Sequence, residues 1–370
     1  MRDWLTFGVA VILAASVSAS APTQDRKAGA AQAQSGSEGG ISWVPAKAGE
    51  LGVDRGELDS IYRDMERDAH HDMKGIVVVR DGRLVSEHYF NGDSVDSPHD
   101  IRSATKSITS LLMGIAVDRG LIRSIDDSIS LYLPGLPKDG KEKISIKDLL
   151  TMRSGLAADD ENPASPGNED RLDESTDWIR TAYSVPMKTE PGMKYLYCSL
   201  NAFLTGAIVE NATHMPLDRF AEANLFAPLG IEHFTWRHVP VDRTTGQGNL
   251  SITTRDEAAV GELMLDDGVV NRQRVVSHEW VARSLASLVA ISDSDAYADF
   301  YGLMWYTKAE PVGGQTIQVH FASGNGGNKI YIIPSLHMVV AITASAYNQP
   351  YRHKRSTDVL LRILAATHSN

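Results

Sequence analysis

The segment Gly75-Ile-Val-Val-Val-Arg80 is followed by Asp81-Gly82 and then by Arg83-Leu-Val-Ser-Glu-His-Tyr89. Two β-branched or alternating runs around Asp-Gly predict a β-hairpin, because glycine adopts the positive φ of a tight turn without steric cost. Upstream, apolar residues recur at helical spacing within residues 53–70 and predict a helix before the hairpin.

The segments that follow change from helical to strand character. From residue 103 to about residue 240 the apolar residues are spaced mostly as in helices, with loops rich in Pro, Gly and Asp between them. Near the C-terminus, short apolar or alternating runs between Gly and Pro turns predict strands over residues 301–306, 317–322, 329–333 and 338–343. A closing helix is predicted over about residues 356–366.

This order of elements predicts an α+β fold in which both ends of the chain build one sheet. The predicted domain covers residues 41–370. Its antiparallel sheet, flanked by helices, takes about residues 41–100 and 298–370, and a helical subdomain of about residues 101–297 is inserted between them.

The N-terminus has the pattern of an export signal. Arg2 gives a short positive region, residues 5–17 are apolar, and Val17-Ser18-Ala19 places small residues at the cleavage positions. We therefore predict a signal peptide over residues 1–19, a flexible linker over residues 20–40, and no membrane span after cleavage. An uncleaved N-terminal anchor is the alternative. The expected location is the periplasm, and outright secretion stays open.

Composition restricts the partners of this protein. The chain has 36 Lys and Arg against 47 Asp and Glu, a net charge of −11. Such a balance argues against binding to nucleic acid or to an anionic membrane and fits a small-molecule partner. Cys198 is the only cysteine, so stability has to come from the core rather than from disulfides.

The first segment that carries chemistry is Ser103-Ala104-Thr105-Lys106. If Ser103 opens a helix, a lysine three residues later lies on the same face and its amine reaches the hydroxyl. A serine hydroxyl needs a neighbouring base to become a nucleophile, and a buried lysine whose ammonium is disfavoured can be that base. The same four residues also fit an N-capping serine followed by a solvated lysine.

Two later segments are candidates for the rest of a site. Residues 191–199 make a Pro-Gly turn and then deliver Tyr197, whose phenol could relay a proton to a leaving group. Residues 320–327 read as a strand that ends in a glycine-rich turn, where backbone can approach a ligand closely. A core tyrosine and a plain tight turn are the respective alternatives.

In this order and at these spacings, the three segments resemble the serine β-lactamase and penicillin-binding-protein superfamily. The likeness is closest to the class-C-like branch, which includes esterases, amidases and 6-aminohexanoate-dimer hydrolases. Flanking segments share it: Leu149-Leu-Thr-Met-Arg-Ser-Gly-Leu156, residues 191–210 and residues 248–265 with Arg255-Asp256. The resemblance runs from about residue 41 to the closing helix and implies a β-lactamase/transpeptidase-like fold.

The resemblance also implies roles for single residues. Ser103 would be the acylated nucleophile, Lys106 its base partner and Tyr197 the proton relay. The backbone N–H groups of Ser103 and Asn325 would form the oxyanion hole, and the strand with Ser323 and Gly324 would hold the substrate. No metal or organic cofactor is implied.

Two departures from the family pattern bear on the substrate. Ser199 stands where many members have Asn in contact with the substrate, and Ala322-Ser323-Gly324 stands where Lys-Thr-Gly would lie. Because Ala322 cannot bind the carboxylate of a β-lactam, we predict a carboxylesterase or linear-amide hydrolase rather than a true β-lactamase. The alternative is a penicillin-binding or sensor-like protein that binds or is acylated without turnover.

Other enzyme classes fit less well. Cys198 has no evident His beside it for a cysteine nucleophile. The chain lacks the Gly-x-Ser-x-Gly segment of an α/β-hydrolase, and His278-Glu279 lacks a second His at the spacing of a zinc site.

Overall fold

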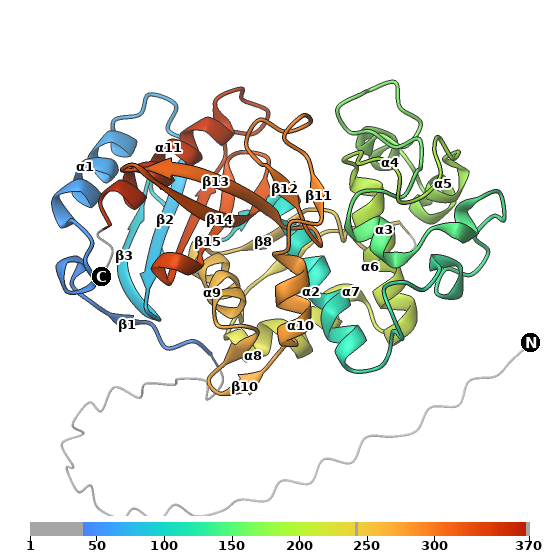
Figure 1. Ribbon diagram of the computed structural model, residues 1–370, viewed down its shortest axis with the longest axis horizontal. Coiled ribbons are helices and arrows are strands. Elements are labelled where there is room, and N and C mark those ends of the chain that lie inside the picture. Colours follow the sequence, from blue (N-terminus) through green and yellow to red (C-terminus); the bar gives the residue numbers. More distant parts are fainter. Residues whose placement is uncertain (1–39, 241–242, 368–370) are drawn as a thin grey trace, which may run out of the picture. The chain divides into compact units, whose positions relative to one another are not determined.

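The computed structural model describes residues 40–240 and 243–367. The predicted signal peptide, and the predicted linker up to residue 39, lie outside the described residues. Nine strands form the main sheet, in the order β1-β3-β2-β16-β15-β14-β13-β12-β11 (Figure 1). The predicted α+β fold is confirmed.

The predicted hairpin consists of β2 (Met73–Arg80) and β3 (Arg83–Tyr89). Asp81 and Gly82 form its turn with φ values of 50° and 67°, the left-handed conformation that an Asp-Gly turn adopts. On its other edge β2 pairs with β16 (Met338–Ala344), the last strand of the chain. This antiparallel pair joins the N-terminal and C-terminal segments into one sheet.

The rest of the sheet is antiparallel with one exception. Its remaining strands are β1 (Val44–Pro45), β11 (Val289–Ala290), β12 (Phe300–Tyr301), β13 (Tyr306–Val312), β14 (Gln315–Gly324) and β15 (Asn328–Ile333). The exception is β1, which pairs in parallel with β3.

One predicted strand is wrong. Residues 301–306 form the turn between β12 and β13, and only Tyr301 and Tyr306 at its ends belong to strands. Met304 has φ of 61°, the Gly302 N–H donates to the Trp305 carbonyl, and Tyr301 pairs with Tyr306 across the turn. Apart from Gly302 this run contains only large apolar or aromatic residues, so its pattern does not indicate the turn.

Helices cover both faces of the sheet. Figure 1 shows α1 (Arg55–Glu66) and α11 (Arg352–Ala365) on one side and α9 (Thr254–Leu265) on the other. The closing helix α11 begins at Arg352, four residues before the predicted start at residue 356.

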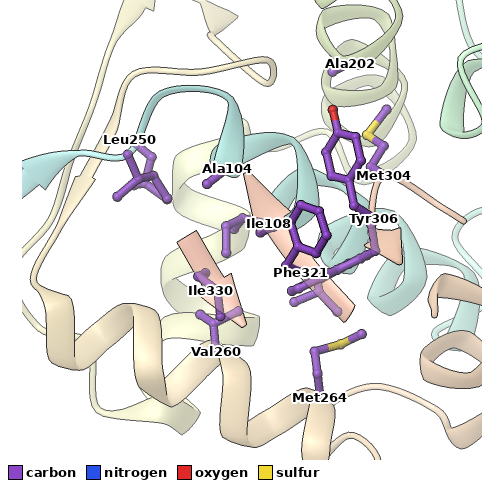
Figure 2. Packing of buried hydrophobic residues seen from close by; sticks show 14 of the residues in the cluster. Ala104, Ile108, Ala202, Leu250, Val260, Met264, Met304, Tyr306, Phe321 and Ile330 are labelled. Atoms are coloured by element: carbon purple, nitrogen blue, oxygen red, sulfur yellow. The ribbon is translucent and has the colours of Figure 1, made fainter. Parts of the chain in front are cut away.

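A close-packed core lies between the sheet and α2 (Thr105–Asp118) and α9. Figure 2 shows Ile330 of β15 beside Val260 of α9, with Ala104 and Ile108 near them. All four side chains are completely buried. This core fixes the position of α2 relative to the end of β14, on which the site depends.

The segment between the two sheet-forming regions contains helices and several short strands. Its further helices are α3 (Ile146–Leu150), α4 (Glu169–Asp173), α5 (Trp178–Ser184), α6 (Ser199–Thr213), α7 (Leu217–Ala221), α8 (Ala227–Leu229) and α10 (His278–Ser284). Its strands, which the spacing of apolar residues did not predict, are β4 (His99–Asp100), β5 (Thr235–Trp236), β6 (His238–Val239), β7 (Arg243–Thr244), β8 (Leu250–Ile252), β9 (Val269–Val270) and β10 (Gln273–Arg274). In the part of the chain that the structure describes, no helix has the length and apolar character needed to cross a membrane.

Candidate active site

Ser103 lies in the short 3₁₀ turn η2 (Arg102–Ala104), directly before α2. Arg102 has φ of 52°, in the left-handed region that residues other than glycine seldom adopt. Gly324, the last residue of β14, lies against this turn, and a Cβ at Gly324 would come within 2.0 Å of the Ile101 carbonyl oxygen. Glycine at this position therefore lets the strand end approach the serine closely.

Lys106, in the first turn of α2, contacts the serine. Its Nζ donates to Ser103 Oγ at 2.9 Å, to Ser199 Oγ at 3.1 Å and to the backbone carbonyl of Gln247 at 2.9 Å. The side chain is 2% exposed, so it is not the solvated lysine of the N-cap alternative. All three hydrogens of the ammonium have acceptors, as a buried charge requires.

Tyr197 lies beside this pair, two residues before the start of α6. The Lys106 Nζ is 5.1 Å from the centre of the Tyr197 ring. Burial raises the pKa of the Tyr197 phenol, and Lys106 and Ser103 offset that increase only in part. The resting site therefore holds a neutral phenol, a hydroxyl and an ammonium close enough to exchange protons.

Acidic groups hold Lys106 in its charged form. Burial by itself lowers the pKa of this ammonium, but Tyr197, which acts once its phenol ionises, and the carboxylates Glu169 and Asp160 together raise it above the ordinary value. Asp160 is fixed at the start of α6, where its Oδ2 accepts from the Ser199 N–H at 2.6 Å. Burial raises the pKa of Asp160 to about 6, so it is ionised at neutral pH. The expectation that burial would disfavour the ammonium therefore fails, because these neighbours outweigh it.

Ser103 faces a cavity of about 600 Å³, a size typical of small-molecule sites. The loop of residues 159–170 forms one wall, and Asn168 ties this loop together by donating to the carbonyls of Asp159 and Asp160. Four acidic side chains of the loop line the cavity: Asp160, Glu161, Glu169 and Asp170.

Another wall comes from the end of the sheet and from α11. Ser323 and Asn325 line it, and behind them lies Lys329 of β15, whose Nζ donates to Ser323 Oγ at 2.8 Å. Arg352 and His353, the first residues of α11, complete this wall. One cavity therefore carries acidic groups on one wall and nitrogen bases on another.

The predicted site residues mostly meet here. Those that line the cavity or contact one another beside it are Ser103, Lys106, Tyr197, Ser323, Gly324 and Asn325. Ser199 differs, because it is completely buried at the start of α6, binds Lys106 and does not line the cavity. The Asn325 side chain pairs with Asn348, its Nδ2 donating to Asn348 Oδ1 at 2.6 Å and its Oδ1 accepting from the Asn348 N–H at 2.9 Å.

Other candidate groups do not join the site chemistry. Burial raises the pKa of the Cys198 thiol, which keeps it protonated and unreactive. Within residues 40–240 and 243–367, no cluster of three or more His, Cys, Asp or Glu side chains could hold a metal ion.

Sequence reasoning missed Asp160, Glu169, Lys329 and Arg352, which contribute charge to the cavity, and His353, which lines it. For Lys329 a signal existed, because it is the one charged residue in the apolar strand Asn328–Ile333. Asp160 and Glu169 had no such signal, since they lie in a loop with several acidic residues and only the folded loop selects among them.

Comparison with known proteins identifies the family. A β-lactamase family model matches residues 63–364. The 6-aminohexanoate-dimer hydrolase of Paenarthrobacter ureafaciens is 26% identical over 298 residues, which cover 75% of this chain and 74% of that protein.

Solved structures share the fold. A class C β-lactamase superposes with a TM-score of 0.65 at 14% identity, over 85% of this chain and 97% of that chain. A D-stereospecific amidohydrolase from Streptomyces sp. gives a TM-score of 0.61 at 18% identity, over 84% and 99% of the two chains. At these identities the likeness shows the fold alone. The sequence resemblance is thus confirmed by a family match over most of the chain and by a common fold: the chain belongs to the β-lactamase family.

Proposed function

We propose that this protein is a serine hydrolase that cleaves an ester or amide bond of a small substrate through an acyl-enzyme on Ser103. The observation that carries the proposal is the 2.9 Å hydrogen bond from Lys106 Nζ to Ser103 Oγ at the edge of the cavity. The relatives named above are hydrolases, which supports the same reaction class.

In the proposed reaction, Ser103 Oγ attacks the carbonyl carbon and gives up its proton to the Lys106–Tyr197 pair. The tetrahedral oxyanion is stabilised by the backbone N–H groups of Ser103 and Asn325. When the bond to the leaving group breaks, the pair returns the proton to the departing alcohol or amine. Water then attacks the acyl carbon, releases the carboxylic acid and restores the Ser103 hydroxyl.

Because Lys106 is held as an ammonium, one proton has to leave the pair before it can accept that of Ser103. The proposal therefore includes a rise of activity toward alkaline pH, where the neutral amine becomes more abundant.

Esters and linear amides are favoured over β-lactams as substrates. Ala322 is completely buried, so this position offers no cation to the carboxylate of a β-lactam. Ser199 is directed to Lys106 and supplies no amide contact to a substrate. We further propose that the protein acts outside the cytoplasm, in the periplasm, after removal of residues 1–19.

The test is intact mass after exposure to a fluorophosphonate and to a p-nitrophenyl ester, for the wild type and for Ser103→Ala. We expect one adduct on the wild type, none on the variant, and loss of ester turnover in the variant. Equal labelling of both proteins contradicts the assignment of Ser103. A wild-type acyl adduct that forms but does not decay would instead identify a protein of the sensor type.

A further inference from the structure

We propose that Lys329, together with Ser323 and Arg352, forms an anion-binding subsite that receives a carboxylate of the substrate. This inference rests on the proposed function and narrows its substrate class to esters or amides that carry a carboxylate away from the bond that is cleaved.

Lys329 is a buried ammonium that reaches the cavity from inside the sheet. It is 1% exposed, and every residue of its strand, Asn328–Ile333, is buried. In the register of β14 and β15 it lies directly across from Ser323, so both side chains are on the same face of the sheet. Both also line the cavity that contains Ser103.

The hydrogen-bonding capacity of Lys329 is mostly unused. Among the described residues its one acceptor is Ser323 Oγ at 2.8 Å, whereas an ammonium has three hydrogens to donate. The rings of Phe321 and Tyr331, with centres 4.6 Å and 6.0 Å from Nζ, add cation–π attraction but no hydrogen bond. Two donor positions are therefore left for a ligand.

Two side chains near Lys329 each have one atom without a hydrogen-bond partner within the described ranges. Arg352 Nε and His353 Nδ1 are buried without a hydrogen-bond partner among the described residues. The acidic group that acts on Lys329 is Asp295, which also lines the cavity, but no ion pair joins the two within the described part of the chain. A buried ammonium without a counter-ion is costly, and a carboxylate ligand would supply that counter-ion.

The charge state of Lys329 agrees with this geometry. Burial lowers its pKa to about 7, with Asp295 raising and Arg352 further lowering the value. Burial, together with the charges of Lys329 and Arg352, lowers the pKa of His353 to about 2, so this imidazole is neutral. A carboxylate that binds here would restore full protonation of Lys329, and its binding would take up a proton near neutral pH.

The acidic wall of the cavity, formed by residues 159–170, favours one orientation of a bound carboxylate substrate. Asp160 and Glu169 repel a carboxylate there, whereas Lys329 and Arg352 attract it and Asp295, which also lines the cavity and acts on Lys329, opposes it in part. The carboxylate of a bound substrate would thus be placed at the sheet end, with its scissile carbonyl near Ser103 between β14 and α2.

The experiment uses pairs of p-nitrophenyl esters: the half-esters of glutarate and adipate, and the same chains closed as neutral methyl esters. A second pair, para-acetoxybenzoate and its methyl ester, carries the charge on the leaving group. For each pair the ratio of kcat/KM, charged over neutral, is measured for wild type, Lys329→Met and Lys354→Met. Lys354 is the matched control, since it is an exposed α11 lysine that is paired with Asp358 and lies outside the cavity lining.

We expect Lys329→Met to lower this ratio about tenfold to a hundredfold for at least one pair, because a charge-assisted hydrogen bond is lost. Lys354→Met should leave it within about twofold. A ratio that Lys329→Met does not change in any pair overturns the proposal. If Lys329→Met does not fold by circular dichroism, Lys329→Gln takes its place.

A second measurement separates this inference from the proposed function. Binding of glutarate and adipate to Ser103→Ala is measured by calorimetry and compared with Ser103→Ala/Lys329→Met. Binding that requires Lys329 supports the subsite even if no ester is hydrolysed, and equal binding, or none, to both proteins contradicts it. Failure of the wild type to form an acyl adduct would overturn the hydrolase proposal alone.

Discussion

Two buried lysines lie at this cavity: Lys106 in helix α2 and Lys329 in strand β15 of the sheet. They differ in the number of hydrogen-bond acceptors and in the direction of their pKa shift. Lys106 has three oxygen acceptors and acidic neighbours that raise its pKa. Lys329 has one acceptor, and burial lowers its pKa to about 7. The two side chains are almost equally buried: Lys106 is 2% exposed and Lys329 is 1% exposed.

The difference shows that burial does not decide the charge of a lysine by itself. Desolvation disfavours both ammonium groups, and the fixed partners decide which of them keeps its proton. The Lys106 site is complete without a ligand, whereas the Lys329 site lacks its counter-ion. We therefore assign Lys106 to chemistry on the protein's own serine and Lys329 to recognition of the substrate.

The largest expected effect comes from removing each lysine and measuring turnover of a neutral p-nitrophenyl ester. Lys106→Met should lower kcat/KM by about a thousandfold or more, because Ser103 loses the group that takes its proton. Lys329→Met should lower it by less than about tenfold, since a neutral substrate makes no ion pair there. Equal losses in both variants would erase the distinction between the two lysines.

The strand and helix patterns of the sequence predicted much of this site but only one of its two lysines. The spacing of Ser103 and Lys106 depends on local helix geometry, which the sequence encodes directly. Tyr197 and residues 320–327 could be assigned only through the resemblance to a family. Lys329 is a lone charge in an apolar strand, but its position at the cavity depends on the register of β14 against β15, which the turn between them sets and the spacing of apolar residues does not reveal.

The same limit applies elsewhere in the fold. Asp81-Gly82 predicted its hairpin because the turn chemistry is local. The turn at Met304 was missed because an apolar residue adopts positive φ there under the constraint of tertiary packing. Likewise Asp160 is selected from its acidic loop only by the Ser199 N–H at the start of α6.

At pH 6, replacing Lys329 by Met should raise the free energy of unfolding, whereas replacing Lys106 by Met should lower it. The folded pKa of Lys329 is below its ordinary value of 10.5, so its protonated form destabilises the native state fully below about pH 7, and this cost disappears above about pH 10.5. The difference from about 7 to 10.5 sets an upper limit of about 5 kcal/mol. Lost cation–π contacts and the lost Ser323 hydrogen bond reduce the expected gain of Lys329→Met to about 2 kcal/mol at pH 6.

For Lys106 the folded pKa is raised, so its ammonium stabilises the native state at pH values below its ordinary pKa, and that contribution is lost only as pH rises through the folded pKa. Lys106→Met should therefore destabilise the protein at pH 6, also because Ser199 Oγ and the Gln247 carbonyl lose their donor. Urea unfolding at about pH 6 and about pH 10 measures both effects. A destabilised Lys329→Met at pH 6 would mean that Lys329 already has an adequate partner in the native protein.

The smallest effect tests whether acidic neighbours make Lys106 different from Lys329. Asp160→Asn keeps an oxygen that can accept from the Ser199 N–H but removes one of the charges that raise the Lys106 pKa. If neutral Lys106 is the base, kcat/KM for a neutral ester rises toward alkaline pH, and the variant shifts this rise to lower pH by about half a unit to one unit. Because Asp160 has a pKa of about 6, the two proteins should converge below that pH, where the wild-type carboxyl is itself protonated.

The control for this profile is Glu161→Gln, which removes the same charge from the same loop. Glu161 lines the cavity but is exposed and is not among the principal groups that raise the pKa of Lys106, so its variant should stay close to the wild-type profile. A shift of equal size in both variants would point to the general field of the acidic wall rather than to Asp160. A profile that Asp160→Asn leaves unmoved would mean that the three hydrogen-bond acceptors alone keep Lys106 charged, and the contrast with Lys329 would then rest on hydrogen bonding instead of on acidic neighbours.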